Sequence, residues 1–379
     1  MSAPTEAIPI LLFVRELGIG GIERDVAKLA LGLDRKRFLP HVATYKPGGP
    51  RHDELHGAGI PILHVEFPSL ISAAALRAAM TLASFIRRNR ITIVHAFDPS
   101  SIFAVPVARL LRVPVVLSSQ LGHRDLYDLK TRKELNVVDR LSDVVVVNCE
   151  ALRGHLIDDC SLPAERIELC YNGVDTREFY PGPTLRPPEL AGASLVIGAV
   201  SVLRPEKGLE LLQAAFAKVR QFVPGSKLLL VGSGPELSNL EANSDRLGIR
   251  DACIFTPAVR APAPLMRAID VFVSSSYSEA FSNAILEAMA CGCCLIGSRV
   301  GGTPELLGED ERGLLFKPGD VDDLAAKLIR VMRDSEMRAR LQASAARHAC
   351  QFLNIERNVQ RNMQIYDMLL ERKRVAHRR

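Results

Sequence analysis

The sequence has 379 residues, of which 47% are hydrophobic, and a formal net charge of +5 at pH 7. With a mean hydropathy of +0.10 it can bury a large core, and its length exceeds that of most single domains, so we expect two. Residues 371–379 hold five Lys or Arg against one Glu and carry +4 of the charge, so the nearly neutral remainder argues against nucleic-acid binding.

Short apolar segments alternate with longer helical patterns through the first half of the chain. We predict β-strands at residues 8–14, 41–45, 91–95, 113–118 and 144–147. Residues 22–33, 73–88 and 101–111 have the residue spacing of helices. This alternation is typical of βαβ units around a parallel sheet, so residues 1–180 are predicted to form one Rossmann-like domain.

Four prolines interrupt the pattern at residues 180–194, and we predict an interdomain linker at 181–194. The pattern then restarts, with strands expected at 195–200, 227–231, 253–255, 271–274 and 294–297. Helices are expected at 209–222, 283–290, 324–332 and 355–372. The second domain is therefore predicted at 195–354. We expect residues 355–379 to form a helix that crosses back to the first domain and ends in a basic tail.

Two Rossmann-like halves without a shared motif suggest domains that face each other across a cleft, where ligands collect at the carboxyl ends of the strands. The start of the chain lacks a basic signal region, and its apolar run at residues 8–14 is too short to span a membrane. We therefore expect a cytoplasmic protein. We interpret its basic tail first as a solvated, frayed end, and peripheral contact with anionic lipid at the inner membrane face is the alternative.

The segment SEAFSNAILE at residues 278–287 follows an apolar strand and contains two carboxylates eight residues apart, Glu279 and Glu287. If a helix begins at Asn283, the two are separated by at most roughly 12 Å along its axis. They cannot share a proton or a metal ion at that distance, but they can hold opposite ends of an extended ligand. The free N–H groups at the helix start favour an anion between them. A diphosphate flanked by two polyols fits this pattern; a capped surface helix is the simpler alternative.

Residues 271–307, VFVSSSYSEAFSNAILEAMACGCCLIGSRVGGTPELL, resemble the donor-binding signature of the family-four glycosyltransferases. These are retaining enzymes of the GT-B fold, and the resemblance extends more thinly over nearly the whole chain. It implies that Glu279 and the backbone amides of Ala280, Phe281 and Ser282 hold the donor sugar, and that Glu287 binds the ribose. Ala280 departs from the family, which usually has glycine there and so a different loop geometry.

The segment SVLRPEKG places Arg204 and Lys207 at a strand-to-helix turn, where cations can meet a diphosphate. Many family members carry an arginine five residues before the lysine, but Val202 occupies that position here, and we expect Arg204 to replace it. A solvated helix start is the alternative for both residues.

Two glycine turns after strands resemble family loops near the diphosphate and the cleft. They contain Gly20 and Gly21 in GIGGIE and Gly232 and Gly234 in VGSGPE. Both lack the third glycine of a dinucleotide fingerprint, which disfavours a nicotinamide or flavin enzyme. With Val259, these glycines complete the donor-binding residues that we predict from the resemblance.

His123, in SSQLGHRD, lies where family members often place a cleft histidine that faces the donor sugar. The local sequence departs from the commoner form, so Gln120 and Arg124 are also candidate cleft contacts. A surface loop is the alternative for this segment. We count His123 with Lys207, Arg204 and Glu279 as the predicted catalytic group.

We expect no metal ion and no cofactor other than the nucleotide sugar as co-substrate. Asp320 and Asp322 spell a D-x-D motif, but they follow Pro318-Gly319 and open a predicted helix, so we interpret Asp320 as an N-cap. Cys291, Cys293 and Cys294 lack the second pair of ligands that a zinc site needs. Lys207, Arg204 and a helix terminus would instead meet the diphosphate charge.

The expected activity is transfer of a sugar from a nucleoside-diphosphate sugar to an acceptor hydroxyl with retention of configuration. The acceptor would be a sugar, a lipid-linked glycan or another small molecule bound to the first domain. Two alternatives stay open. One is an epimerase or phosphorylase of the same fold, although we identify neither an acid/base carboxylate pair nor a pyridoxal lysine. The other is a nucleotide-sugar-binding subunit without turnover.

Overall fold

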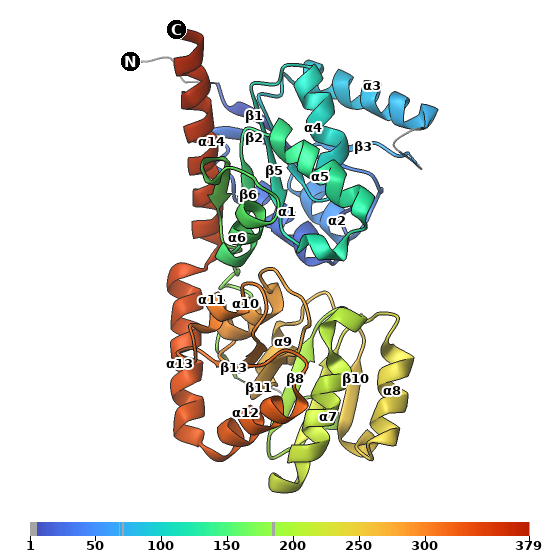
Figure 1. Cartoon of the computed structure of the whole chain (residues 1–379), viewed down its shortest axis with the longest axis vertical. Helices are drawn as coiled ribbons and strands as arrows, with labels where there is room; N and C mark the ends of the chain where they lie inside the picture. The colour runs from blue at the N-terminus through green and yellow to red at the C-terminus, as the bar shows by residue number, and fades with distance from the viewer. Residues whose placement is uncertain (1–5, 68, 70–71, 184–185, 379) are drawn as a thin grey trace. The chain divides into compact units, whose positions relative to one another are not determined.

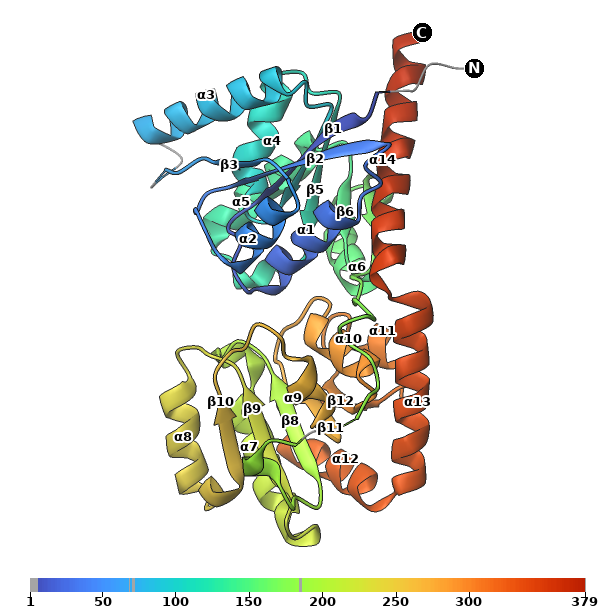
Figure 2. The same cartoon turned by 180° about the vertical axis from the view of Figure 1, so that it is seen from behind.

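The computed structural model describes residues 6–67, 69, 72–183 and 186–378, so residues 184–185 of the predicted linker and the last residue of the tail lie outside the described part. The chain forms two compact units. Unit 1 comprises Met1–Gly173 with Ile355–Arg379, and unit 2 comprises Val174–Asn354. Each unit is a parallel sheet with helices packed on its faces (Figures 1 and 2).

Unit 1 has a seven-stranded parallel sheet in the order β3-β2-β1-β4-β5-β6-β7. Its strands are β1 (Ile8–Val14), β2 (Phe38–Thr44), β3 (Ile62–His64), β4 (Ile93–Phe97), β5 (Val115–Gln120), β6 (Val145–Val147) and β7 (Ile167–Leu169). Its helices are α1 (Gly21–Gly32), α2 (Pro50–Gly57), α3 (Ala73–Arg88), α4 (Ser101–Leu110), α5 (Leu129–Leu141), α6 (Glu150–Asp158) and α14 (Ile355–Arg378).

Strand β1 illustrates why this sheet is covered on both faces. Ile10 and Leu12 belong to the core cluster that includes residues of α1 and α14. Leu11 and Phe13 belong to a second cluster, with residues of α3 and α4. Because successive side chains of a strand point to opposite faces, a strand buried on both faces has a continuous apolar sequence. The predicted strand at residues 8–14 is accordingly confirmed without a change of bounds.

Helix α14 is part of unit 1 through both its apolar and its charged side chains. Tyr366 is fully buried, and its hydroxyl lies 2.8 Å from Nδ1 of His95 in β4. Burial lowers the pKa of His95 to about 3, so the ring is neutral at physiological pH. Two ion pairs, Arg37 with Asp367 and Lys373 with Asp143, are both 2.6 Å long. The helix therefore contributes to the core of unit 1.

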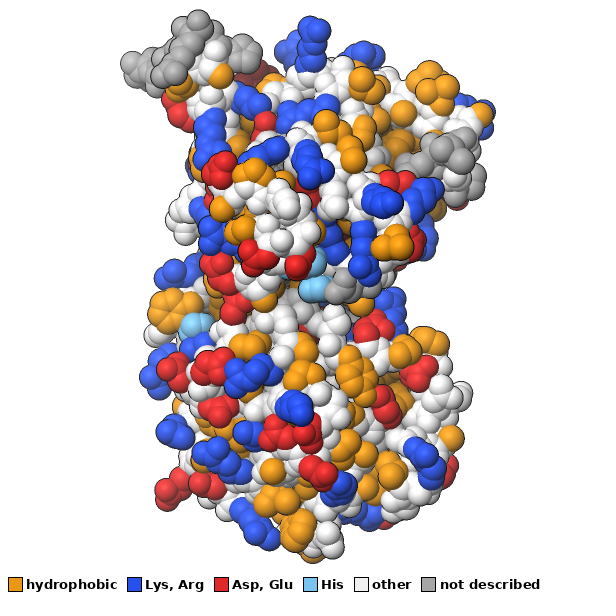
Figure 3. All heavy atoms as spheres, in the orientation of Figure 1, with side chains coloured by type: hydrophobic (Ala, Val, Ile, Leu, Met, Phe, Trp, Pro, Cys, Tyr) orange, Lys and Arg blue, Asp and Glu red, His pale blue; other side chains and the backbone are white. Residues whose placement is uncertain are grey.

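Unit 2 has a six-stranded parallel sheet in the order β10-β9-β8-β11-β12-β13. Its strands are β8 (Val196–Val200), β9 (Lys227–Val231), β10 (Cys253–Thr256), β11 (Val271–Ser274), β12 (Cys294–Ser298) and β13 (Leu314–Phe316). Its helices are α7 (Leu209–Val219), α8 (Leu237–Arg246), α9 (Ala263–Arg267), α10 (Asn283–Ala290), α11 (Thr303–Leu307), α12 (Val321–Arg333) and α13 (Ser335–Phe352). Acidic and basic side chains are interspersed over this unit on the face drawn in Figure 3.

The unit boundary lies at residues 173–174, earlier than the boundary predicted at 180. The described residues of the predicted linker belong to unit 2, because their polar and apolar groups bind there. Leu190 is fully buried, and Arg186 donates hydrogen bonds to Ala193 O and Asp270 Oδ2, both at 2.6 Å. Within the described ranges, no helix has both the length and the apolar composition needed to cross a membrane.

Candidate active site

The carboxyl edge of the unit 2 sheet brings together two side chains that are 72 residues apart in sequence. Lys207 ends the short 3-10 helix η4 (Pro205–Lys207) after β8, and Glu279 follows β11. The Lys207 Nζ lies 2.6 Å from the Glu279 Oε2, and the side chains are 23% and 16% exposed. Strands β8 and β11 are adjacent but lead in opposite directions across the sheet, and ligands of such sheets bind at this switch point.

Gly208 lets the two loops approach closely enough for this ion pair. Its φ of +56° is in the left-handed region, and a Cβ there would lie 2.4 Å from Ser275 O. Ser275 Oγ in turn donates a hydrogen bond of 2.9 Å to Lys207 O. Ser275 was not among the predicted site residues, and neither was Ser276, whose Oγ lies 3.4 Å from Glu279 Oε2. The run of serines at residues 274–276, before Glu279, is the sequence feature that could have indicated them.

Helix α10 begins at Asn283, as predicted, and its first turn lies between the two glutamates in sequence. Ser282 is the N-cap, and its side chain accepts from Ile285 N at 3.4 Å. Ala280, Phe281 and Ser282 are 4–7% exposed, and Glu287 is 3% exposed. Backbone N–H groups at the start of a helix attract anions, so this turn can meet negative charge between Glu279 and Glu287.

Two glycines hold the loop that carries Glu279 and Ala280. Gly301 has a φ of +48°, and a Cβ on it would lie 1.8 Å from Glu279 O. Gly302 N donates a hydrogen bond of 2.6 Å to Ala280 O. Ala280 itself is not among the described residues with positive φ. Alanine is therefore compatible with this backbone, although the family usually has glycine there.

The predicted glycine turn after β9 lies against the segment after β8. A Cβ on Gly232 would lie 1.8 Å from Ser201 O, and one on Gly234 would lie 2.2 Å from Leu203 O. Backbone atoms cannot yield at those distances, so packing alone requires both glycines. Their predicted contact with the donor stays a prediction.

Arg204 and Val259 are more exposed than the other predicted residues of unit 2. The Arg204 side chain is 60% exposed and lies 3.8 Å from Glu206, and Val259 is 38% exposed. The segment after β10 is tied to the glycine turn, because Ala258 N donates to Ser233 Oγ at 3.0 Å. Both predicted residues thus belong to loops at the carboxyl edge of the sheet.

A hollow of about 420 Å³ lies in unit 2, lined by Pro205, Glu206, Glu210, Glu236 and Tyr277. The Tyr277 hydroxyl donates to Glu210 Oε1 at 2.8 Å, and this hydrogen bond raises the pKa of the tyrosine. Tyr277 was not among the predicted site residues. The acidic lining of this hollow does not suit a diphosphate. The exposed ring of Tyr277 instead offers an apolar surface beside η4.

The remaining predicted residues, Gly20, Gly21 and His123, belong to unit 1. Gly20 is the N-cap of α1, after β1, and Gly21 is the first residue of that helix. The ring of His123 lies 4.5 Å from that of His155, measured between centroids. The structure thus places them at the carboxyl edge of the unit 1 sheet, and their roles toward a donor stay predictions.

Asp320 is the N-cap of α12, as predicted: its Oδ1 accepts from Asp322 N at 3.1 Å and from Asp323 N at 3.0 Å. The D-x-D motif therefore serves the helix. Among the residues that the structure describes, no group of three His, Cys, Asp or Glu side chains is arranged to hold a metal ion.

Comparison with known proteins gives two family matches. The model for Glycosyl transferases group 1 matches residues 185–348, and the model for Glycosyltransferase Family 4 matches residues 19–178. The N-acetyl-alpha-D-glucosaminyl L-malate synthase of Bacillus anthracis is 29% identical over 271 residues, which cover 69% of this chain and 71% of that protein. A D-inositol 3-phosphate glycosyltransferase of Stackebrandtia nassauensis is 32% identical over 225 residues.

The match to the Stackebrandtia protein covers 56% of this chain and only about half of that protein, 51%. Among solved structures, Anabaena HepE in complex with UDP and glucose superposes with a TM-score of 0.82 at 22% identity, covering 96% of this chain and 100% of that one. This likeness identifies two Rossmann-like domains of the GT-B type. The chain thus belongs to the group 1 glycosyltransferases of the family-four type and has the GT-B fold.

Proposed function

We propose that this glycosyltransferase moves a sugar from a nucleoside-diphosphate sugar to an acceptor hydroxyl, with retention of anomeric configuration and without a metal ion. The observation that carries the proposal is the Lys207–Glu279 pair at the switch point of unit 2, next to the start of α10. The relative HepE was solved with UDP and glucose, which supports a donor of this class. Neither family model nor either relative described above is an epimerase.

Each group has a role that its chemistry allows. A lysine ammonium has three N–H donors, so Lys207 can keep Glu279 and still donate to a phosphate oxygen. The dipole of α10 and the backbone N–H groups at its start add positive potential for the diphosphate. Glu279 would accept from hydroxyls of the donor sugar, and the buried Glu287 would accept from the ribose.

The reaction breaks the bond between the anomeric carbon and the diphosphate oxygen and forms one to the acceptor oxygen on the same face. The acceptor proton passes to an oxygen of the leaving diphosphate, so no protein nucleophile is required. The share of the protein is orientation and stabilisation of the charge that grows on the leaving group. A cytoplasmic location and contact of the basic tail with the inner membrane face stay predictions.

A panel of UDP-, GDP-, ADP- and dTDP-sugars, tested by thermal shift and by release of the nucleoside diphosphate, examines this proposal. One nucleotide class is expected to raise the melting temperature, because a ligand at about 100 times its Kd adds roughly 2.7 kcal/mol of apparent stability. A non-catalytic subunit would bind the same donor without releasing the diphosphate. Absence of both binding and release for every donor would refute the proposal.

Transfer is expected to continue in excess EDTA, since Lys207 and the start of α10 supply the positive charge that a metal ion supplies elsewhere. Initial rates are to be measured with EDTA and after addition of Mg²⁺ or Mn²⁺. Loss of activity in EDTA that either ion restores would contradict the metal-independent mechanism.

A further inference from the structure

Two adjacent strands of unit 1 lead into buried polar side chains that have unused hydrogen-bonding atoms. Asp98 directly follows β4 and is 3% exposed; its Oδ1 accepts from Ser101 Oγ at 3.2 Å, but its Oδ2 has no hydrogen-bond partner among the described residues. Gln120 ends β5 and is 1% exposed, and its Nε2 has no partner within the same part of the chain. When Asp98 is ionised, its unused oxygen is an acceptor, whereas the unused amide nitrogen of Gln120 is a donor.

The register of the sheet places these two residues side by side. Phe97 of β4 pairs with Ser119 of β5, and Asp98 N donates to Ser119 O at 3.1 Å. Asp98 and Gln120 are the next positions along these strands. Neighbouring strands are about 4.8 Å apart, so a single small group can reach both side chains.

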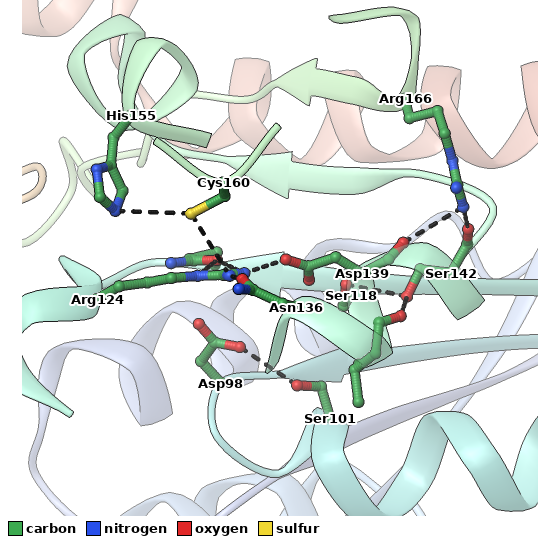
Figure 4. Close-up of polar contacts among 12 residues, drawn as sticks. Asp98, Ser101, Ser118, Arg124, Asn136, Asp139, Ser142, His155, Cys160 and Arg166 are labelled. Carbon is green, nitrogen blue, oxygen red and sulfur yellow. Dashed lines mark hydrogen bonds and ion pairs between the residues drawn. The ribbon is translucent and has the colours of Figure 1, made fainter. Parts of the chain in front are cut away.

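Arg124 fixes which end of the Gln120 amide is unused. Its Nε and Nη2 donate to Gln120 Oε1 at 3.0 and 2.7 Å, so the amide oxygen is occupied and the NH₂ group points elsewhere. Arg124 is itself 2% exposed, and it binds Asp139 and Asn136 and lies 3.7 Å from Cys160 Sγ. Figure 4 shows this guanidinium among its partners, with Asp98 beside Ser101. The network holds Gln120 rigidly.

The position in the fold is that of a ligand site. Strands β1 and β4 are adjacent, but the chain continues from β1 toward β2 and β3 and from β4 toward β5 to β7. The loops after β1 and β4 therefore flank the switch point of unit 1. The charge of Asp98 helps burial raise the pKa of Tyr127, while the charges of Arg15 and Arg124 lower it. The loops after β1, β4 and β5 carry Arg15, Asp98 and Tyr127 respectively, all at this edge of the sheet.

The buried position of Asp98 is unfavourable for the charged form of its carboxyl. Burial, helped by the charge of Asp139, raises the pKa of its carboxyl to about 8, although Arg124 and the Ser101 hydrogen bond act in the opposite direction. A buried polar group without a partner destabilises the folded state unless a ligand or an ordered water satisfies it. Such a cost is typical of a binding position.

We propose that Asp98 and Gln120 form a hydroxyl-binding subsite for a polyhydroxylated acceptor. A hydroxyl both donates and accepts, so one hydroxyl satisfies Asp98 Oδ2 and Gln120 Nε2 together. This assignment rests on the proposed function, because it places the acceptor on unit 1 while the nucleotide sugar occupies unit 2. A polar pair of this kind discriminates strongly against analogues that lack the hydroxyl.

The test uses Asp98→Asn and Gln120→Glu in the full chain, which keep the contacts to Ser101 and Arg124. Each substitution reverses the hydrogen-bonding role of one unused atom. Asp98→Asn therefore presents two donors to the hydroxyl, and Gln120→Glu presents two acceptors. Binding of D-glucose, myo-inositol and D-inositol 3-phosphate is measured by saturation-transfer NMR with the nucleoside diphosphate present, at a pH above the Asp98 pKa of about 8, where the carboxyl is ionised. At least one compound is expected to bind, and each single variant should weaken it about tenfold or more.

The double variant Asp98→Asn with Gln120→Glu swaps donor and acceptor and should recover most of the lost affinity. Asp53→Asn, at a side chain that is 79% exposed in the same unit, is the matched control and should bind as the wild type does. Unchanged binding in both single variants, with or without a change in melting temperature, would identify a structural water position and overturn the proposal. Absence of binding by the wild type to all three compounds would overturn it too.

Nucleotide-sugar binding, measured in the same samples, separates this proposal from the proposed function. If neither the wild type nor any variant binds the nucleotide sugar, while acceptor binding still depends on Asp98, the donor assignment alone is refuted.

Discussion

Lys207→Ala is expected to lower kcat by about 100- to 1,000-fold while weakening donor binding far less. Negative charge on the diphosphate grows as the glycosidic bond breaks, so a fixed ammonium stabilises the transition state more than the bound donor. The structure adds one effect, since Lys207 also neutralises Glu279 at 2.6 Å. Removing the lysine leaves that carboxylate without its cation, so a small fall in melting temperature should accompany the loss of turnover.

The measurement is kcat, donor Kd and melting temperature on one preparation of each protein. Lys218→Ala is the matched control, because Lys218 also pairs with a carboxylate of unit 2, that of Asp322, but its side chain is 51% exposed and far from β11 in sequence. The control should retain wild-type turnover. Undiminished kcat in Lys207→Ala, or collapse of the fold, would refute the assigned role.

Glu287→Gln is expected to weaken donor binding by roughly ten- to 150-fold, since a hydrogen bond to a charged group contributes about 1.5–3 kcal/mol. Glutamine is preferred to alanine because Glu287 is 3% exposed in α10 and a truncation would leave a cavity. Donor Kd is measured by calorimetry, and Glu336→Gln, at an exposed glutamate in the first turn of α13, is the control.

Ribose analogues make this second prediction specific. If Glu287 binds the ribose hydroxyls, 2′,3′-dideoxy nucleotides should bind the wild type more weakly than the parent nucleotide, and Glu287→Gln should lose that difference. An unchanged Kd in a folded variant, or discrimination that survives the substitution, would remove the ribose role.

The sequence predicted the interior strands well, because a strand covered on both faces has a distinctive apolar run, as at residues 8–14. It did not predict β3, β7 or β13, each of which has only three residues. So short a segment shows no periodicity, and β6 (Val145–Val147), which is equally short, was recognisable because it lies in a run of four valines. The proline-rich stretch was also misleading, because Arg186 and Leu190 bind to unit 2 through contacts that composition does not reveal.

For the site, the sequence supplied Lys207 and Glu279 separately but not their ion pair. No partner for Lys207 other than the adjacent Glu206 was apparent in the local sequence, because a contact across 72 residues depends on the order of the strands. Gly301 and Asp98 were missed for the same reason. Gly301 is distinguished by the close approach of Glu279 O, and Asp98 by a carboxylate oxygen that has no hydrogen-bond partner among the described residues.

Retaining transfer from a nucleotide sugar can be tested by proton NMR of the first sugar product formed from the donor that the panel identifies. We expect a first-formed product with the anomeric configuration of the donor, released together with one equivalent of nucleoside diphosphate and in the presence of EDTA. A first-formed product of the opposite configuration, or no diphosphate released from any donor in the panel, would contradict it.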